Sequence, residues 1–129
     1  MKYILMMNAP KDGWEAMMSW PKDAIHRHIE FMHQFNAKLK SAGELVAAEG
    51  LMPPSEAKMV RARKDGPPVI DGVFAETKEF LAGWWIVEAP TAERAYAIAA
   101  EASTAPGPNG EPFCIPIEVR QVASGPPEV

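Results

Sequence analysis

Residues 22 to 43 read KDAIHRHIEFMHQFNAKLKSAG and contain the clearest helical pattern in the chain. Apolar side chains recur three or four positions apart, which places them along one face of an α-helix, at positions 25, 29, 32, 35, 39 and 42. Gly43 follows, and glycine is the residue with which helices commonly end. The spacing predicts a helix over residues 22 to 42 whose apolar face packs on a sheet.

Short apolar runs on both sides of this helix predict strands. Residues 2 to 7 are apolar at both alternating sets of positions, as in a central strand covered on both faces. Residues 44 to 51 predict a second strand, which ends before Pro53 because proline cannot continue a strand ladder. Between the first strand and the helix, residues 9 to 22 predict a loop or one short helical turn with apolar side chains, which can act as a lid.

The second half of the chain repeats the order strand, helix, strand. Its predicted elements are a hairpin with arms at 57–63 and 69–70, a strand at 80–89, a helix from Thr91 to about Ser103, and a last, half-exposed strand at 115–120. The full order is that of a ferredoxin-like α+β fold with an extra β-hairpin, in which two helices cover one face of an antiparallel sheet. We expect one domain over residues 1–122 and a flexible tail at 123–129.

The second face of such a sheet needs a cover, because a large apolar face left in water promotes aggregation. A second copy of the chain is the simplest source of that cover. We therefore predict a homodimer, assembled in the manner of a dimeric α/β-barrel.

Charge and cysteine content exclude several classes of protein. A net charge of −4 leaves no basic field for nucleic acid. The single cysteine, Cys114, excludes an intrachain disulfide, and we expect it as a buried thiol in the last strand. The apolar run at the N-terminus is too short for a signal peptide or a membrane span. These features predict a cytoplasmic protein that binds neither membrane nor nucleic acid.

Residues 71 to 79 read DGVFAETKE and are followed by Gly83, Trp84 and Trp85. This run, together with AGEL at 42–45 and EGL at 49–51, closely resembles the signature of the YCII-related, DGPF-type proteins. The resemblance covers roughly residues 1 to 122. Val73 stands where the family name has proline.

The resemblance implies a dimeric ferredoxin-like fold with a cleft between sheet and helices. It also implies a His and Asp pair of catalytic use, and a link to extracytoplasmic-function sigma factors. No cofactor and no established substrate belong to what it implies.

His28 is the histidine best placed for such chemistry. It falls within the apolar face of the predicted helix, whereas His26 and His33 lie at its edge or beyond. A histidine there can be a general acid or base, or a core side chain satisfied by one hydrogen bond. No two of the three histidines are three or four positions apart, which disfavours a metal site on this helix.

The remaining candidates lie in or after the DGVF run. Asp71 either orients His28 or holds a turn through its own backbone. Glu76, Thr77 and Lys78 either bind an anionic or carbonyl-bearing ligand or form a solvated loop. Trp84 and Trp85 point to opposite faces of the sheet, and we assign Trp84 to ligand binding, with core packing as the alternative.

Two classes of function follow. The first is a small cofactor-independent enzyme in which His28 is the acid or base and Asp71 orients it. The second is a non-catalytic dimeric module that binds a small molecule in the same cleft or acts with a sigma factor. A cofactor-independent monooxygenase on the same general fold is a third.

Overall fold

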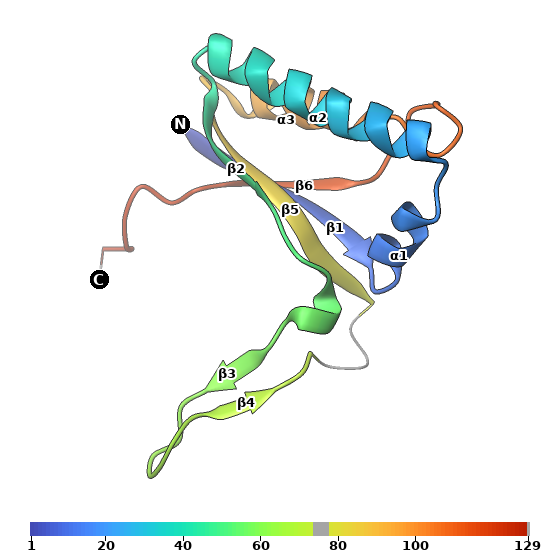
Figure 1. Ribbon diagram of the computed structural model, residues 1–129. Helices are drawn as coiled ribbons and strands as arrows, with labels where there is room; N and C mark the ends of the chain where they lie inside the picture. The colour runs from blue at the N-terminus through green and yellow to red at the C-terminus, as the bar shows by residue number, and fades with distance from the viewer. Residues whose placement is uncertain (74–77, 129) are drawn as a thin grey trace.

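The computed structural model describes residues 1–73 and 78–128, and it contains a four-stranded antiparallel sheet with two long helices on one face (Figure 1). In chain order the elements are β1 (Lys2–Pro10), α1 (Gly13–Met18), α2 (Lys22–Ser41), β2 (Leu45–Gly50), the 3₁₀ turn η1 (Pro54–Glu56), β3 (Met59–Arg61), β4 (Val69–Asp71), β5 (Glu79–Glu88), α3 (Ala92–Ser103) and β6 (Ile117–Gln121).

The strand order β2-β5-β1-β6 is that of a ferredoxin-like sheet. Each β-α-β half encloses one strand of the other half, so β1 and β5 are the central pair, as the apolar pattern of residues 2 to 7 predicts. The long helices also begin and end where the sequence predicts. Gly43 follows α2 with a φ of 73°, and the Thr91 side chain accepts the backbone N–H of Arg94 at the start of α3.

The core lies between the sheet and the two long helices. Tyr3 and Leu5 of β1 pair with Val87 and Trp85 of β5 on this face, and all four are buried. The Trp85 ring meets the Phe35 ring of α2 edge to face, with 5.7 Å between ring centroids. Burial of these apolar side chains supplies most of the driving force for folding.

The other face of the sheet, called the open face below, points away from α2 and α3 (Figure 1). Its centre is apolar, because Ile4 pairs with Ile86 and Met6 with Trp84. Charged side chains of the outer strands flank this centre, namely Glu49 of β2 and Glu118 and Arg120 of β6. The four central residues are half-buried.

Residues 57 to 71 form a hairpin, called the arm below. Its strands β3 and β4 pair with each other in a separate two-stranded sheet, as the turn composition of residues 65 to 68 predicts. The arm extends beyond the main sheet, on the side away from α2 and α3 (Figure 1). Its residues are exposed except for Val69, which is half-buried.

Two expectations about side-chain burial are wrong. Cys114 is exposed and precedes β6, with a φ of 58°, because its backbone N–H donates to Ser103 O at the end of α3 and the chain turns there before the strand begins. Ile29 is 42% exposed, because the buried face of α2 runs along Ala24, Phe35 and Leu39 and is rotated away from it.

No helix in residues 1–73 and 78–128 is long and apolar enough to cross a membrane.

Candidate functional site

His28 lies on the second turn of α2 and is half-buried. Its Nδ1 atom lies 3.0 Å from the carbonyl oxygen of Pro106, in the loop that follows α3. A carbonyl oxygen only accepts hydrogen bonds, so Nδ1 carries the proton in this contact. In the neutral ring the lone pair is then on Nε2, and that atom can accept a proton.

Two aromatic side chains extend the surroundings of His28. The Trp20 ring meets the imidazole edge to face at 5.8 Å, and the Phe113 ring meets Trp20 in the same way at 5.2 Å. Trp20 comes from the connection between α1 and α2, and Phe113 from the loop after α3. Two connections that are distant in sequence thus meet at His28.

The loop after α3 is held in place by its own hydrogen bonds. Gly107 N donates to Glu111 O at 2.8 Å, and Pro106 and Pro112 form an isolated β-bridge. At its end, the Ser103 hydroxyl donates to Ile115 O at 2.7 Å. The carbonyl of Pro106 is therefore fixed in position when it accepts from His28.

A cavity of about 260 Å³ lies between α2 and the β2–β5 side of the sheet. Its lining is mostly apolar and comes from four elements: Met7, Met32, Asn36, Ala48, Glu49, Gly50, Ala82, Gly83, Trp84 and Trp85. Asn36 Oδ1 accepts the indole N–H of Trp85 at 2.8 Å, which leaves the Asn36 amide N–H₂ as a donor. By the register, the side chains of Glu49 and Trp84 belong to the open face, so Asn36 is the polar side chain that the cavity offers against an apolar wall.

Glycine at position 83 allows β2 and β5 to approach each other at this cavity. A Cβ atom there would lie 3.2 Å from the Glu49 carbonyl oxygen, which is tighter than an ordinary contact. Gly50, its partner in the register, also lines the cavity. Because Gly83 and Gly50 have no side chain, this part of the sheet face is free of side chains that would fill the cavity.

His28 and the cavity lie on the same face of α2. Met32 and Asn36 line the cavity, and His28 precedes Met32 by four residues, which is about one helical turn. His28 is not among the residues that line the cavity. A ligand in the cavity would have to extend past Met32 to contact the imidazole.

The structure places the other candidate residues in different regions. Asp71 ends β4 in the arm and is exposed, and α2 and β4 lie on opposite sides of the main sheet (Figure 1). The hydrogen bonds of the described residues include none between His28 and Asp71. Lys78 is exposed just before β5, whereas Glu76 and Thr77 lie outside the described residues. Trp84 is the one sequence candidate that lines the cavity within the described part of the chain.

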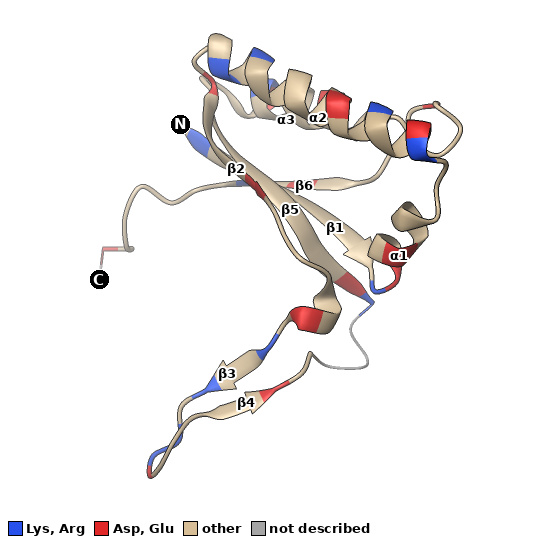
Figure 2. Cartoon of the chain, viewed as in Figure 1, with Lys and Arg blue, Asp and Glu red and all other residues tan. Residues whose placement is uncertain are grey.

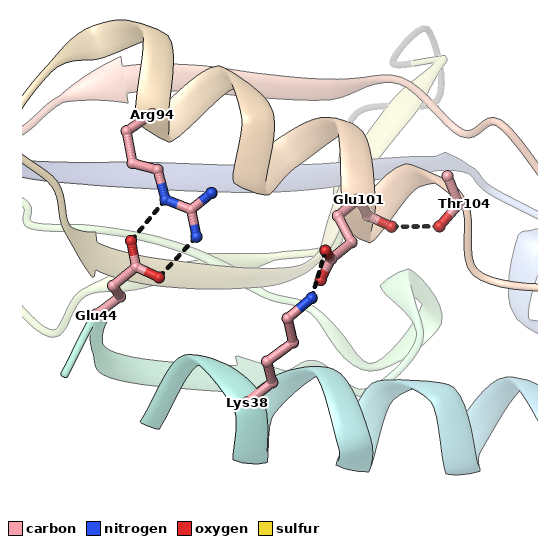
Figure 3. A network of polar contacts seen from close by, with 5 residues as sticks. All are labelled: Lys38, Glu44, Arg94, Glu101 and Thr104. Atoms are coloured by element: carbon pink, nitrogen blue, oxygen red, sulfur yellow. Dashed lines mark hydrogen bonds and ion pairs between the residues drawn. The ribbon is translucent and has the colours of Figure 1, made fainter. Parts of the chain in front are cut away.

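A group of ionic contacts joins α2, α3 and the residue before β2 (Figure 3). Arg94 of α3 donates from both Nε and an Nη atom to the Glu44 carboxylate, each at 2.7 Å. The hydrogen bond from Arg94 lowers the pKa of Glu44 and raises that of Arg94. Lys38 and Glu101 pair nearby at 2.8 Å. These contacts join α2, α3 and the start of β2, so their role is structural.

The YCII-related domain family matches residues 1–107. The chain belongs to this family. An uncharacterised protein of Rhizobium meliloti is 30% identical to it over 105 residues, which is 81% of each chain. The match includes β1, α2, β2, β5 and α3, and so contains every element that lines the cavity of this YCII-related protein.

The sequence reasoning missed Asn36 and Pro106. Asn36 could have been found, because it lies eight residues after His28 and so falls on the same face of the predicted helix. Pro106 acts through its backbone carbonyl, which any residue carries, so its side chain gives no signal. In the part of the chain that the structure describes, no group of three or more His, Cys, Asp or Glu side chains could hold a metal ion.

Proposed function

We propose that this YCII-related protein binds a small organic molecule in the cavity between α2 and the β2–β5 side of the sheet. The observation that carries the proposal is the cavity itself, with its apolar lining and the polar side chain of Asn36, which reaches it from α2. Pockets of this composition, largely apolar with a few placed polar groups, are typical ligand sites.

The lining defines the chemical class of the ligand. The cavity volume of about 260 Å³ is small, which favours a compact molecule. The Asn36 amide offers a donor, which favours an acceptor oxygen on the ligand. An aromatic ring with a short carboxylate-bearing chain meets these requirements, because the ring would lie against Trp85 and Met32.

The test compares 3-phenylpropionate with phenethylamine, which has a similar size and the opposite charge. We expect 3-phenylpropionate to shift the indole N–H signal of Trp85 and the Asn36 amide signals in ¹H–¹⁵N NMR spectra, and phenethylamine to bind more weakly. Ala48→Leu fills the cavity and should abolish these shifts. Ala37→Leu, on the exposed side of α2, is the matched control. Equal binding by wild type and Ala48→Leu would contradict the proposal.

We also propose that the protein is a homodimer in which a second copy covers the open face. Support comes from its apolar centre of Ile4, Met6, Trp84 and Ile86 between charged outer strands, which is the composition of many interfaces. Met6→Asp should place a charge in that centre and give a folded monomer by sedimentation velocity. A dimer of unchanged affinity would contradict this part.

Catalysis by His28 is a second candidate, and the contact with Pro106 favours it. That contact fixes the tautomer in which Nε2 accepts a proton, as a general base requires. Long-range ¹H–¹⁵N correlation spectra should show His28 protonated on Nδ1 at neutral pH, and the opposite tautomer would exclude this role. The link to a sigma factor stays a prediction of the family resemblance.

A further inference from the structure

The arm carries apolar side chains that its own chain leaves in water. Met59, Val60 and Ile70 are 48%, 64% and 61% exposed. Val60 and Ile70 are opposite each other in the register, so their side chains share one face of the arm. An isolated two-stranded hairpin is at best marginally stable in water. The arm therefore has the composition of an element that becomes stable against a partner.

The charge of the arm is opposite to that of the rest of the chain. The arm has four basic residues and two acidic ones, whereas the remaining chain has nine basic and fifteen acidic residues. Figure 2 shows the basic positions on β3 and toward the tip of the hairpin. The ion pairs of the described residues all lie outside the arm, so its basic groups are available. A second copy of the same chain offers the complementary acidic surface.

The position of the arm matches that partner. The arm lies beyond the main sheet on the side of the open face (Figure 1). Residues 58 to 64, extended at about 3.3 Å per residue, span about 20 Å, and four strands spaced by about 4.8 Å make a sheet roughly 15 Å wide. An arm of this length can cross the sheet of a copy that covers the open face.

We propose that the arm is an intersubunit clasp, in which its basic side chains contact carboxylates at the rim of the second copy's open face. Glu49 and Glu118 are the rim carboxylates that flank the apolar centre there. Lys58, Arg61, Arg63 and Lys64 supply the positive charge. The clasp rests on the proposed homodimer, and the two-fold relation between copies gives each dimer two such contacts.

Cross-linking within an isotopically mixed dimer tests the clasp directly. Equal amounts of ¹⁴N- and ¹⁵N-labelled full-length protein are mixed, equilibrated and treated with a carbodiimide, which joins an amine to a carboxylate with no spacer. We expect tryptic peptides of mixed isotope content that join Lys58 or Lys64 to Glu49 or Glu118. Arm lysines joined solely within one isotope would overturn the clasp.

Charge reversal provides the second measurement. Arg61→Glu combined with Arg63→Glu should weaken the dimer at least tenfold by sedimentation velocity at low salt, whereas Arg27→Glu on the exposed side of α2 should leave its affinity unchanged. The two proposals fail in different ways. If the wild-type protein is a dimer and reversal of the arm charges leaves its affinity unchanged, the clasp alone is overturned. If the wild-type protein is a monomer at every concentration, the clasp and the dimer are both overturned.

Discussion

The main sheet and the arm are built from the same kinds of residue and are stabilised differently. In the main sheet, Leu5 and Val87 are fully buried beneath two helices. In the arm, Val60 and Ile70 are just as apolar, and most of their surface is exposed. The comparison teaches that pairing two strands does not make a core, because a β-ladder is stable only when one of its faces is covered. Matched substitutions in the two regions test this difference.

The largest contrast is expected between Leu5→Ala and Val60→Ala. Leu5 is fully buried, so truncation should lower the free energy of unfolding by about 3 kcal/mol through lost burial and the cavity left behind. Val60→Ala should change it by less than about 0.5 kcal/mol. Urea unfolding at one fixed protein concentration measures both. Similar losses would mean that the arm is part of the cooperative core.

The two residues of the predicted catalytic pair provide the next contrast. His28→Ala removes the hydrogen bond to Pro106 O and the contact with Trp20, so it should cost about 1 to 2 kcal/mol. Asp71→Ala, at an exposed position in the arm, should stay within about 0.5 kcal/mol. Thermal melts compare the two. His28→Asn, which keeps a donor near Nδ1, should recover part of the loss, and no recovery would show that packing alone matters.

Glycines at positive φ give a smaller contrast. Gly43 follows α2 at 73°, so Gly43→Ala should cost about 1 kcal/mol because a Cβ atom disfavours this conformation. Gly66 has a φ of 111° in the arm turn, and Gly66→Ala should strain the hairpin with little effect on the melting temperature of the main domain. Circular dichroism melts report the domain, and amide hydrogen exchange reports the arm. An equal loss of melting temperature would contradict the separation of the two regions.

The smallest of these contrasts comes from Glu44→Gln. This change should lower the free energy of unfolding by about 0.5 kcal/mol near neutral pH, a small loss because Arg94 is partly exposed. The pKa of Glu44 is lowered in the folded protein from its ordinary 4.5 by the hydrogen bond from Arg94. The stabilisation is therefore complete above the ordinary pKa and is lost as the pH falls through the lowered one.

The free energies of unfolding of wild type and Glu44→Gln should thus converge on acidification from pH 7 to pH 3. Glu101→Gln, at the more exposed pair with Lys38, is the control and should show a smaller gap at every pH. A gap that persists at pH 3 would mean that the carboxylate charge of Glu44 is not its cause.

The sequence predicted those parts of the fold that depend on local pattern. The spacing of apolar residues placed α2, the capping residue Thr91 placed the start of α3, and the turn residues before Val69 placed the hairpin. The exposure of Ile29 was missed, because periodicity defines an apolar face only to within part of a turn. The exposure of Cys114 was missed, because its backbone N–H donates to Ser103 O and the last strand begins only after this turn of the chain.

The candidate site was less predictable, because it depends on how distant segments meet. His28 was correctly separated from His26 and His33, which are both exposed on α2. The position of Asp71 depends on the direction in which the arm leaves the sheet, and no local pattern encodes that direction. The contact between His28 and Pro106 joins positions that are 78 residues apart through a backbone atom. A sequence offers no side-chain signal for such a contact.

Cys114 gives the loop beside His28 a reporter that needs no engineering. It is the single cysteine of the chain, it is exposed, and it directly follows Phe113, whose ring packs on Trp20. A thiol-reactive fluorophore would therefore attach at one position. Tryptophan quenches many such dyes on contact, so the emission of the labelled protein would report any separation of this loop from Trp20.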